Sequence, residues 1–203
     1  IDKRDVHRTP PAPFTTSTLQ QAAANKLGWS AKRTMQVAQS LYEEGLITYH
    51  RTDSTNLAQE AVKAAADYLS KTFGIDYALA EPRIYKTKSK VAQEAHEAIR
   101  PTSVLRDPEK VKPFLDPAMF KLYQLIWQRF VASQMEAALY DALSVDVTGQ
   151  GSDHVYTLRT AGSVVKFPGF LIVYEETKDE DKKSDEEDEL NVRIPASIAE
   201  GQK

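Results

Sequence analysis

Tyr49 and Arg51 are the two residues whose types and spacing best suit covalent chemistry. Side chains two residues apart on extended backbone share one face, so the phenol and the guanidinium would lie side by side. A phenol has an ordinary pKa of about 10 and is a poor nucleophile at neutral pH unless its anion is stabilised. A neighbouring guanidinium stabilises that anion, binds a phosphate and neutralises charge that develops at phosphorus. The pair therefore predicts attack on a phosphate, although a tyrosine packed at a strand end beside a surface arginine fits the same two residues.

His96 and Arg100 form a second candidate group, in a segment whose sequence predicts a short helix over 93–100. Residues four apart on a helix share a face, so both side chains could reach one phosphate, and the histidine could relay a proton. A surface histidine with no such role is the alternative. No second histidine lies at ligand spacing, so we expect no metal site within this chain.

The elements that must position the tyrosine begin with two predicted helices. Ser17 has capping-box spacing for the first helix, which ends at Gly28. Ser30 caps the second helix, which ends at Gly45. A β-prone run follows at 46–49, and this order is typical of a helix-turn-helix motif that leads to a wing.

Polar and basic side chains around this motif are assigned to DNA binding together with Arg100. They are Lys32, Arg33, Thr52 and Ser54. The first two open the second helix, where they can contact phosphates. Many helical domains share this layout without binding DNA.

Beyond the tyrosine the sequence predicts helices first and strands afterwards. The expected helical part consists of a helix over 56–73 opened by Asn56, a loop over 75–90, and a long helix opened by Asp116-Pro117. Near Tyr140 the apolar period changes from about 3.6 residues to 2. The expected strands are 143–148, a hairpin over 155–167 that turns at Ala161-Gly162, and further strands over 170–174 and 192–194.

Charge is unevenly distributed along the 203 residues. Residues 175–189 hold ten acids and three lysines, a net −7, which leaves +4 for the remainder of a chain whose total is −3. We expect this tract to be a mobile loop, because it cannot bury enough apolar area to offset its ordering entropy. The remaining positive charge permits phosphate binding without demanding it.

Composition excludes several classes of protein. A chain with 41% hydrophobic and 27% charged residues is typical of a soluble globular protein, and neither a membrane span nor a signal peptide is visible. The absence of cysteine excludes disulfides and fits a reducing cytoplasm. No phosphate-binding glycine loop, esterase elbow or dinucleotide fingerprint occurs, so nucleotide hydrolysis is not expected. The first residue, Ile1, and the ending at Lys203 suggest a piece of a larger protein.

Two runs of constrained residues resemble the active-site pattern of type IA DNA topoisomerases. They are Gln39-x-Leu41-Tyr42-Glu43 and, after three residues, Ile47-Thr48-Tyr49-x-Arg51-Thr52-Asp53. The flanking segments Pro11–Gln21 and Gln93–Pro101 resemble further blocks of the family, the second in the form of its bacterial topoisomerase I branch. The likeness is clear over 11–101 and weak in the β-rich tail.

The resemblance implies an α+β multidomain fold, in which a helical winged-helix-like domain is inserted into a β-rich gate domain. Residues 1–13 would be an N-terminal segment of the gate domain. Residues 14–138 would be the winged-helix-like domain, with its helix-turn-helix and the active-site tyrosine. Residues 139–203 would return to the gate domain, with the acidic loop 175–189.

The resemblance also implies roles for individual residues. Tyr49 would break and reseal one DNA strand through a 5′-phosphotyrosine intermediate, which relaxes negatively supercoiled DNA without ATP. Arg51 would stabilise the phosphate, and His96 would be a third catalytic residue that contacts DNA near the scissile bond. His50 stands at a variable position of the pattern; since neighbouring strand residues face opposite ways, we expect it to point away from the chemistry.

Partners and cofactors follow from the same likeness. The expected partners are the single-stranded segment of negatively supercoiled DNA and the Toprim and C-terminal DNA-binding domains of the same full-length chain, with no membrane. Mg²⁺ would be bound in the full-length enzyme by Toprim residues outside this chain. The fragment alone is therefore expected to be inactive, and the enzyme to be cytoplasmic and associated with the nucleoid.

Two other hypotheses remain open on sequence grounds. In the first, the chain is a non-catalytic winged-helix DNA-binding module with a structural Tyr49. In the second, it is a protein-interaction domain with no role on DNA, which the net charge of −3 favours. An upstream Toprim sequence with paired acids would favour the topoisomerase hypothesis over both alternatives.

Overall fold

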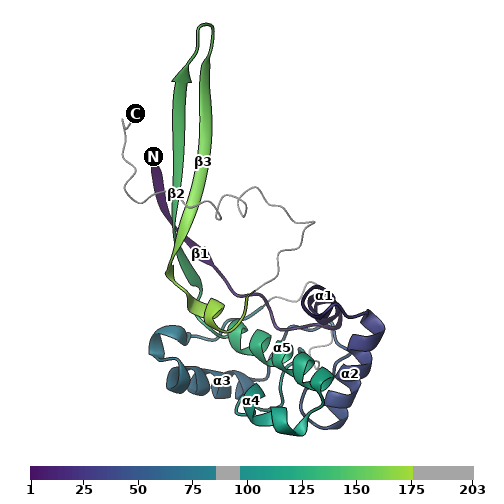
Figure 1. Cartoon of the computed structure of the whole chain (residues 1–203). Helices are drawn as coiled ribbons and strands as arrows, with labels where there is room; N and C mark the ends of the chain where they lie inside the picture. Colours follow the sequence, from purple (N-terminus) through teal and green to yellow (C-terminus); the bar gives the residue numbers. More distant parts are fainter. Residues whose placement is uncertain (86–96, 176–203) are drawn as a thin grey trace. The chain divides into compact units, whose positions relative to one another are not determined.

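The computed structural model describes residues 1–85 and 97–175, and these residues form two compact units (Figure 1). Ile1–Thr9 and Ala137–Gly169 make a sheet unit. Pro10–Glu136, together with residues 170–175, make a helical unit. The described residues therefore have the α+β fold that the sequence predicts, and it consists of five α-helices and a three-stranded antiparallel sheet.

The sheet unit has the strand order β1-β2-β3. Its strands are β1 (Asp2–Arg8), β2 (Ala138–Gln150) and β3 (Val155–Phe167). β1 pairs with the first half of β2, whereas β3 pairs along the whole of β2. The alternation that predicts a strand over 143–148 is confirmed in β2.

The position of the hairpin turn differs from the prediction. Ala161 and Gly162 lie inside β3, where they pair with Ser144 and Leu143 of β2. The chain instead reverses over 151–154. Small residues are tolerated within a paired strand, and the cross-strand ladder outweighs their local preference for turns.

The helical unit contains five α-helices and three short 3₁₀ helices among the described residues. The α-helices are α1 (Thr16–Leu27), α2 (Ala31–Glu43), α3 (Gln59–Thr72), α4 (Pro108–Val111) and α5 (Pro117–Ser133). The 3₁₀ helices are η1 (Ile75–Tyr77), η2 (Lys112–Phe114) and η3 (Gly169–Ile172). The strand predicted over 170–174 is wrong, because its first residues belong to η3.

Four of the five α-helices in the described residues begin with a side-chain cap, whereas α3 follows Ala58 without one and is not opened by Asn56 as predicted. The hydroxyl of Ser30 caps α2 and the carboxylate of Asp116 caps α5, as predicted. α1 differs from the prediction, since its N-cap is Thr15 in a reciprocal capping box with Thr18, and Ser17 lies inside the helix. Each of these caps satisfies backbone amides that a helix start leaves without partners.

The core of the helical unit forms along α5. Tyr123, Ile126 and Phe130 are fully or almost fully buried there. The Trp127 indole donates a hydrogen bond to the carbonyl of Val104 at 3.0 Å. Burial raises the pKa of the Tyr123 hydroxyl, which therefore stays protonated as a hydrogen-bond donor inside the core.

Residues 97–100 are extended and not helical, contrary to the prediction for 93–100. The amide of Ala98 donates to the carbonyl of Asn56, and the amide of Ile99 donates to that of Phe14, each at 2.8 Å. These remote partners take the hydrogen bonds that a helix would have used internally. Tertiary pairing thus overrides a helical sequence pattern here.

Several predictions fall outside the described residues. These are the role of His96, the mobility of the acidic tract beyond Glu175, and the strand over 192–194. Among the residues that are described, no helix is long and apolar enough to cross a membrane.

Candidate active site around Tyr49

Tyr49 lies on an irregular extended segment that follows α2. Gly45, with a left-handed φ of 66°, turns the chain after the helix. Ile47 is buried and makes a single antiparallel bridge with Pro101, so the β-prone run at 46–49 is an isolated bridge and not a strand. The Tyr49 side chain is 46% exposed. The backbone is therefore anchored while the phenol reaches solvent.

Two other rings pack against the Tyr49 ring. The Tyr42 ring, from α2, lies 5.3 Å away between centroids at an interplanar angle of 65°. The His50 ring lies 5.3 Å away at 64°. Edge-to-face contacts of this kind are favourable, and they limit the rotation of the central ring. Tyr42 is itself half-exposed, and its ring supports that of Tyr49.

The expectation that His50 points away from the tyrosine is wrong. Its side chain is fully buried against the Tyr49 and Tyr42 rings. Strict alternation of faces does not apply, because the backbone around His50 is a bend and not a regular strand. Neither ring nitrogen has a hydrogen-bond partner among the described residues. Burial, assisted by the charge of Arg51 and opposed by Glu43, lowers the pKa of His50, so the imidazole is neutral at pH 7.

The loop after Tyr49 places Arg51 at the surface and its neighbours inside. Thr52 and Ser54 are buried, and their hydroxyls accept hydrogen bonds from the amides of Ser54 and Asn56 at 3.0 and 3.1 Å. Thr16 of α1 closes the loop, since its hydroxyl accepts from the Thr52 amide at 2.9 Å. Because Thr52 and Ser54 are buried and bonded within the loop, their placement favours a role in holding the loop. It does not favour the contact with DNA that the sequence predicts.

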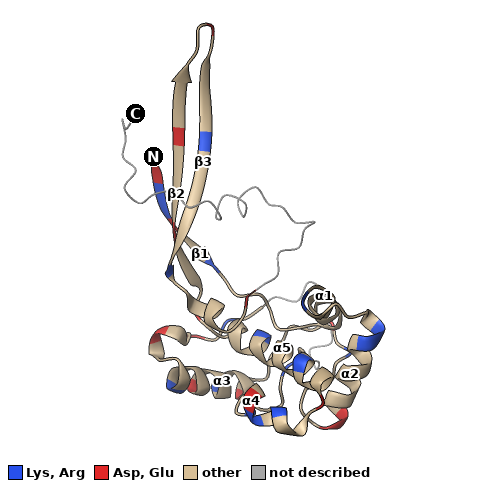
Figure 2. Cartoon of the chain, in the orientation of Figure 1, with Lys and Arg blue, Asp and Glu red and all other residues tan. Residues whose placement is uncertain are grey.

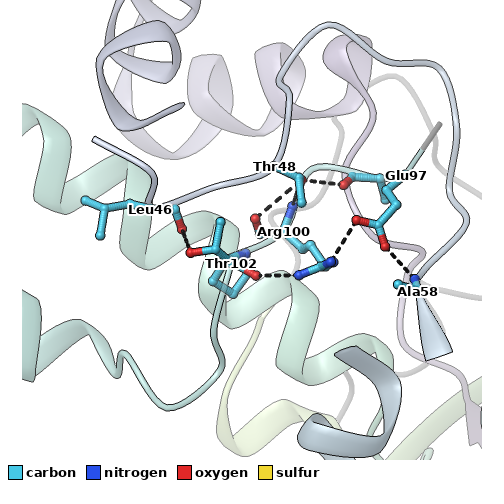
Figure 3. A network of polar contacts seen from close by, with 8 residues as sticks. Leu46, Thr48, Ala58, Glu97, Arg100 and Thr102 are labelled. Carbon is cyan, nitrogen blue, oxygen red and sulfur yellow. Dashed lines mark hydrogen bonds and ion pairs between the residues drawn. The ribbon is translucent and has the colours of Figure 1, made fainter. Parts of the chain in front are cut away.

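Arg100, the other predicted DNA contact near the tyrosine, is held by its own segment (Figure 3). Its guanidinium forms an ion pair of 2.7 Å with Glu97 and donates to the carbonyl of Pro101 at 3.0 Å. Because 97–100 is extended, the helical face that was to join His96 to Arg100 does not form over its described residues.

Lys32 and Arg33 are exposed at the start of α2, as predicted. Figure 2 shows basic residues at this start and acidic residues at the end of the helix. Both placements oppose the helix dipole, which favours acids at the start and bases at the end by about 0.3–1 kcal/mol each. The helix dipole therefore does not explain these cations, although the Arg33 guanidinium also lies over the Trp29 ring, 4.5 Å from its centroid.

No group of three or more His, Asp or Glu side chains able to hold a metal ion occurs among residues 1–85 and 97–175.

Sequence reasoning missed two residues that shape the site, Thr16 and Glu97. Thr16 bonds the loop after Tyr49, and Glu97 joins Arg100 to the amide of Ala58 before α3 at 2.6 Å. The bond from Thr16 to His50 spans 34 positions and that from Ala58 to Glu97 spans 39, so no local periodicity could have indicated these two contacts, although Glu97 and Arg100 are only three positions apart. The start of α3 has no side-chain cap of its own. The need for a carboxylate from elsewhere in the chain at this helix start was the one signal that could have pointed to Glu97.

Comparison with known proteins decides the family. Residues 1–203 match the sequence profile of the family described as DNA topoisomerase. This chain belongs to the DNA topoisomerase family. The membership predicted from the two runs around Tyr49 is thereby confirmed.

Topoisomerase relatives cover nearly the whole chain. It is 46% identical over 204 residues to DNA topoisomerase 1 of Xylella fastidiosa, an alignment that covers 96% of this chain and 24% of that protein. For DNA topoisomerase 1 of Rickettsia typhi the identity is 44% over 203 residues, covering 96% and 25%. The structure of full-length topoisomerase I from Thermotoga maritima matches with a TM-score of 0.72 and 36% identity, over 87% of this chain and 29% of that one. The chain thus spans about a quarter of the length of these two curated topoisomerases.

Proposed function

We propose that this chain is the strand-cleaving part of a bacterial type IA DNA topoisomerase, with Tyr49 as the nucleophile. The phenol loses its proton and its oxygen attacks phosphorus in one DNA strand, forming a bond to the 5′ phosphate. The bond from phosphorus to the 3′ oxygen breaks, and that oxygen takes up a proton and leaves as a hydroxyl. Attack by the same hydroxyl reverses these steps. No ATP is needed, because one phosphate ester replaces another, and passage of the other strand through the break relaxes negative supercoils.

The observation that carries this proposal is the exposed phenol of Tyr49 on an anchored backbone, in a chain of this family. A nucleophile must reach its phosphate and must also be held in the geometry of attack. The bridge at Ile47 and the rings of Tyr42 and His50 supply the second condition.

Arg51 is proposed to stabilise the phosphate during attack. Its charge is close enough to His50 to lower the pKa of that imidazole, and the His50 ring contacts Tyr49. Arg51 is also exposed and follows Tyr49 by two residues, so its guanidinium is available to a phosphate bound at the phenol. A guanidinium at this position would neutralise the negative charge that develops at the reacting phosphate.

The remaining partners are also proposed from family membership. DNA would contact Lys32 and Arg33 on α2, and His96 would approach the scissile bond. Mg²⁺ would be bound by a Toprim domain elsewhere in the full-length chain. C-terminal DNA-binding domains would form a further part of that chain. The helical unit would be a winged-helix-like insert in a β-rich gate domain, and the enzyme would act on the nucleoid in the cytoplasm.

Tyr49→Phe in the full-length enzyme tests the assignment. The change removes one oxygen and keeps the ring contacts with Tyr42 and His50. Fold and DNA binding should survive, while plasmid relaxation and covalent DNA adduct fall to background. Tyr42→Phe is the matched control, because it also keeps the ring, and it should leave both activities nearly intact. Substantial adduct from Tyr49→Phe would favour the non-catalytic DNA-binding module instead.

A further inference from the structure

Residues 97–102 run alongside the segment that ends at the tyrosine (Figure 3). The amide of Thr48 donates to the carbonyl of Arg100, and the amide of Thr102 donates to the carbonyl of Leu46, both at 2.9 Å. This ladder is the main backbone support that the described residues give to the segment before the phenol.

The side chain of Thr48 adds two hydrogen bonds to the same neighbour. Its hydroxyl donates to the carbonyl of Ala98 at 2.7 Å and accepts from the amide of Arg100 at 2.9 Å. Thr48 is thus fixed through both its backbone and its side chain. Since Tyr49 follows directly, the place of its phenol depends on the conformation of residues 98–100.

An ion pair between Glu97 and Arg100 connects the two ends of this short segment. Arg100 donates from Nη2 to Oε2 of Glu97 at 2.7 Å, three positions earlier in the chain. The other oxygen of Glu97 accepts from the amide of Ala58 at 2.6 Å, which ties the pair to the start of α3. The Arg100 side chain is only 12% exposed, and its Nε is buried without a hydrogen-bond partner among the described residues. The guanidinium is therefore directed into the protein.

We propose that Glu97 and Arg100 form a positioning pair for Tyr49, in which Arg100 fixes the segment that holds Thr48 and does not bind a DNA phosphate. This inference rests on the function proposed above and replaces the assignment of Arg100 to DNA binding. The charge of Arg100 is neutralised by Glu97, whereas a phosphate contact requires an available cation. A misplacement of about 1 Å costs about 10²-fold in rate, so loss of the pair should slow cleavage about 10- to 100-fold.

The test compares Glu97→Gln, Arg100→Gln and the double variant in the full-length enzyme. Three quantities are measured: the single-turnover cleavage rate with saturating oligonucleotide, the affinity for that oligonucleotide, and the dependence of the affinity on salt. Each single variant should cleave about 10- to 100-fold more slowly with affinity and salt dependence unchanged. The double variant should be no slower than the slower single one, because the two residues act as one unit.

Direct binding of a phosphate by Arg100 predicts the opposite pattern. Arg100→Gln would then reduce the slope of log affinity against log salt by about 0.7, the value for one phosphate on a single strand. Glu97→Gln would raise the affinity, since it would free the arginine. Either result overturns the proposal, and so does cleavage at the wild-type rate by both single variants.

The ion pair between Glu109 and Lys112 provides a matched control. It has the same spacing of three residues and a distance of 3.1 Å, but both side chains are more than half exposed. Glu109→Gln should leave cleavage and salt dependence unchanged. Tyr49→Phe is measured in parallel: if it still forms adduct, the proposed function fails, whereas normal cleavage by the pair variants beside an inactive Tyr49→Phe refutes the positioning pair alone.

Discussion

The segment around Tyr49 and the hairpin of β2 and β3 expose side chains for different reasons. In the hairpin, strands adjacent in sequence pair with each other, and Val147 and Leu158 face each other across it with 52% and 71% of their surfaces exposed. The Tyr49 segment has little regular structure, yet Thr16 and residues 97–102 bond it from distant parts of the chain. The hairpin is thus maintained by its own ladder, and the tyrosine segment by its surroundings.

This difference predicts where a substitution will change stability or catalysis. A ladder of many equivalent hydrogen bonds tolerates the removal of one exposed side chain. An irregular segment depends on a few specific interactions, most of them buried, and its geometry changes when any of them is removed. Polar groups near Tyr49 should therefore matter for both stability and catalysis, whereas exposed hairpin side chains should matter for neither.

Among charge and packing changes near Tyr49, the largest effect is expected from Arg51→Ala in the full-length enzyme. Removal of a preorganised charge donor costs about 10²–10³ in rate. Arg51→Lys should recover only part of this loss, because an ammonium lacks the planar fork of donors. The measurement is the cleavage rate with saturating oligonucleotide. Equal rates for wild type and Arg51→Ala would show that the exposed guanidinium takes no part in the attack.

Thr16→Val should have the next largest effect. The hydroxyl that it removes donates to the carbonyl of His50 and accepts from the buried amide of Thr52, both at 2.9 Å. An amide left without a partner costs about 1–3 kcal/mol in the free energy of unfolding. Thr157→Val on the exposed face of β3 is the matched control and should change stability by less than about 0.5 kcal/mol. Denaturant unfolding would contradict the comparison if the two variants lost the same stability.

His50 should make stability depend on pH. Its pKa in the folded protein is lowered below the ordinary 6.5, so below that pH the unfolded chain binds a proton that the folded chain excludes. Stability due to the neutral imidazole is full above pH 6.5 and is lost as the pH falls toward the lowered pKa. His50→Phe keeps a buried ring without this titration. Thermal unfolding between about pH 7.5 and 5 should show a smaller decrease for the variant, and equal decreases would contradict this account of His50.

The smallest effect is expected from Leu158→Ser in the hairpin. The side chain is largely exposed, so its removal should change the free energy of unfolding by no more than about 0.5 kcal/mol. A decrease above about 2 kcal/mol, measured by denaturant unfolding, would show that the hairpin depends on this side chain as the tyrosine segment depends on its buried interactions.

Sequence reasoning succeeded where the determinants are local. The caps at Ser30 and Asp116 and the alternation in β2 depend on neighbouring residues, and the structure has them as predicted. The two runs around Tyr49 identified the family because their residue types and spacing are specific.

It failed where remote partners decide the conformation. Residues 97–100 carry a helical pattern but form bonds with Phe14, Thr48 and Asn56, which no local reasoning could supply. His50 packs against Tyr49 because the segment bends there, whereas alternation assumes a regular strand. Both failures concern the irregular segment around Tyr49, whose conformation depends on residues distant in the sequence. The residues that hold Tyr49 in place could therefore be identified only from the structure.

The most direct test of the central claim is to identify the residue that becomes joined to DNA. The full-length enzyme is trapped on a labelled oligonucleotide, the complex is digested with protease and nuclease, and the peptide that retains the nucleotide is sequenced by mass spectrometry. The account predicts a single modified peptide, with the nucleotide attached through its 5′ phosphate to the phenol of Tyr49. Attachment to Tyr42, to any other residue, or through a 3′ phosphate would contradict it.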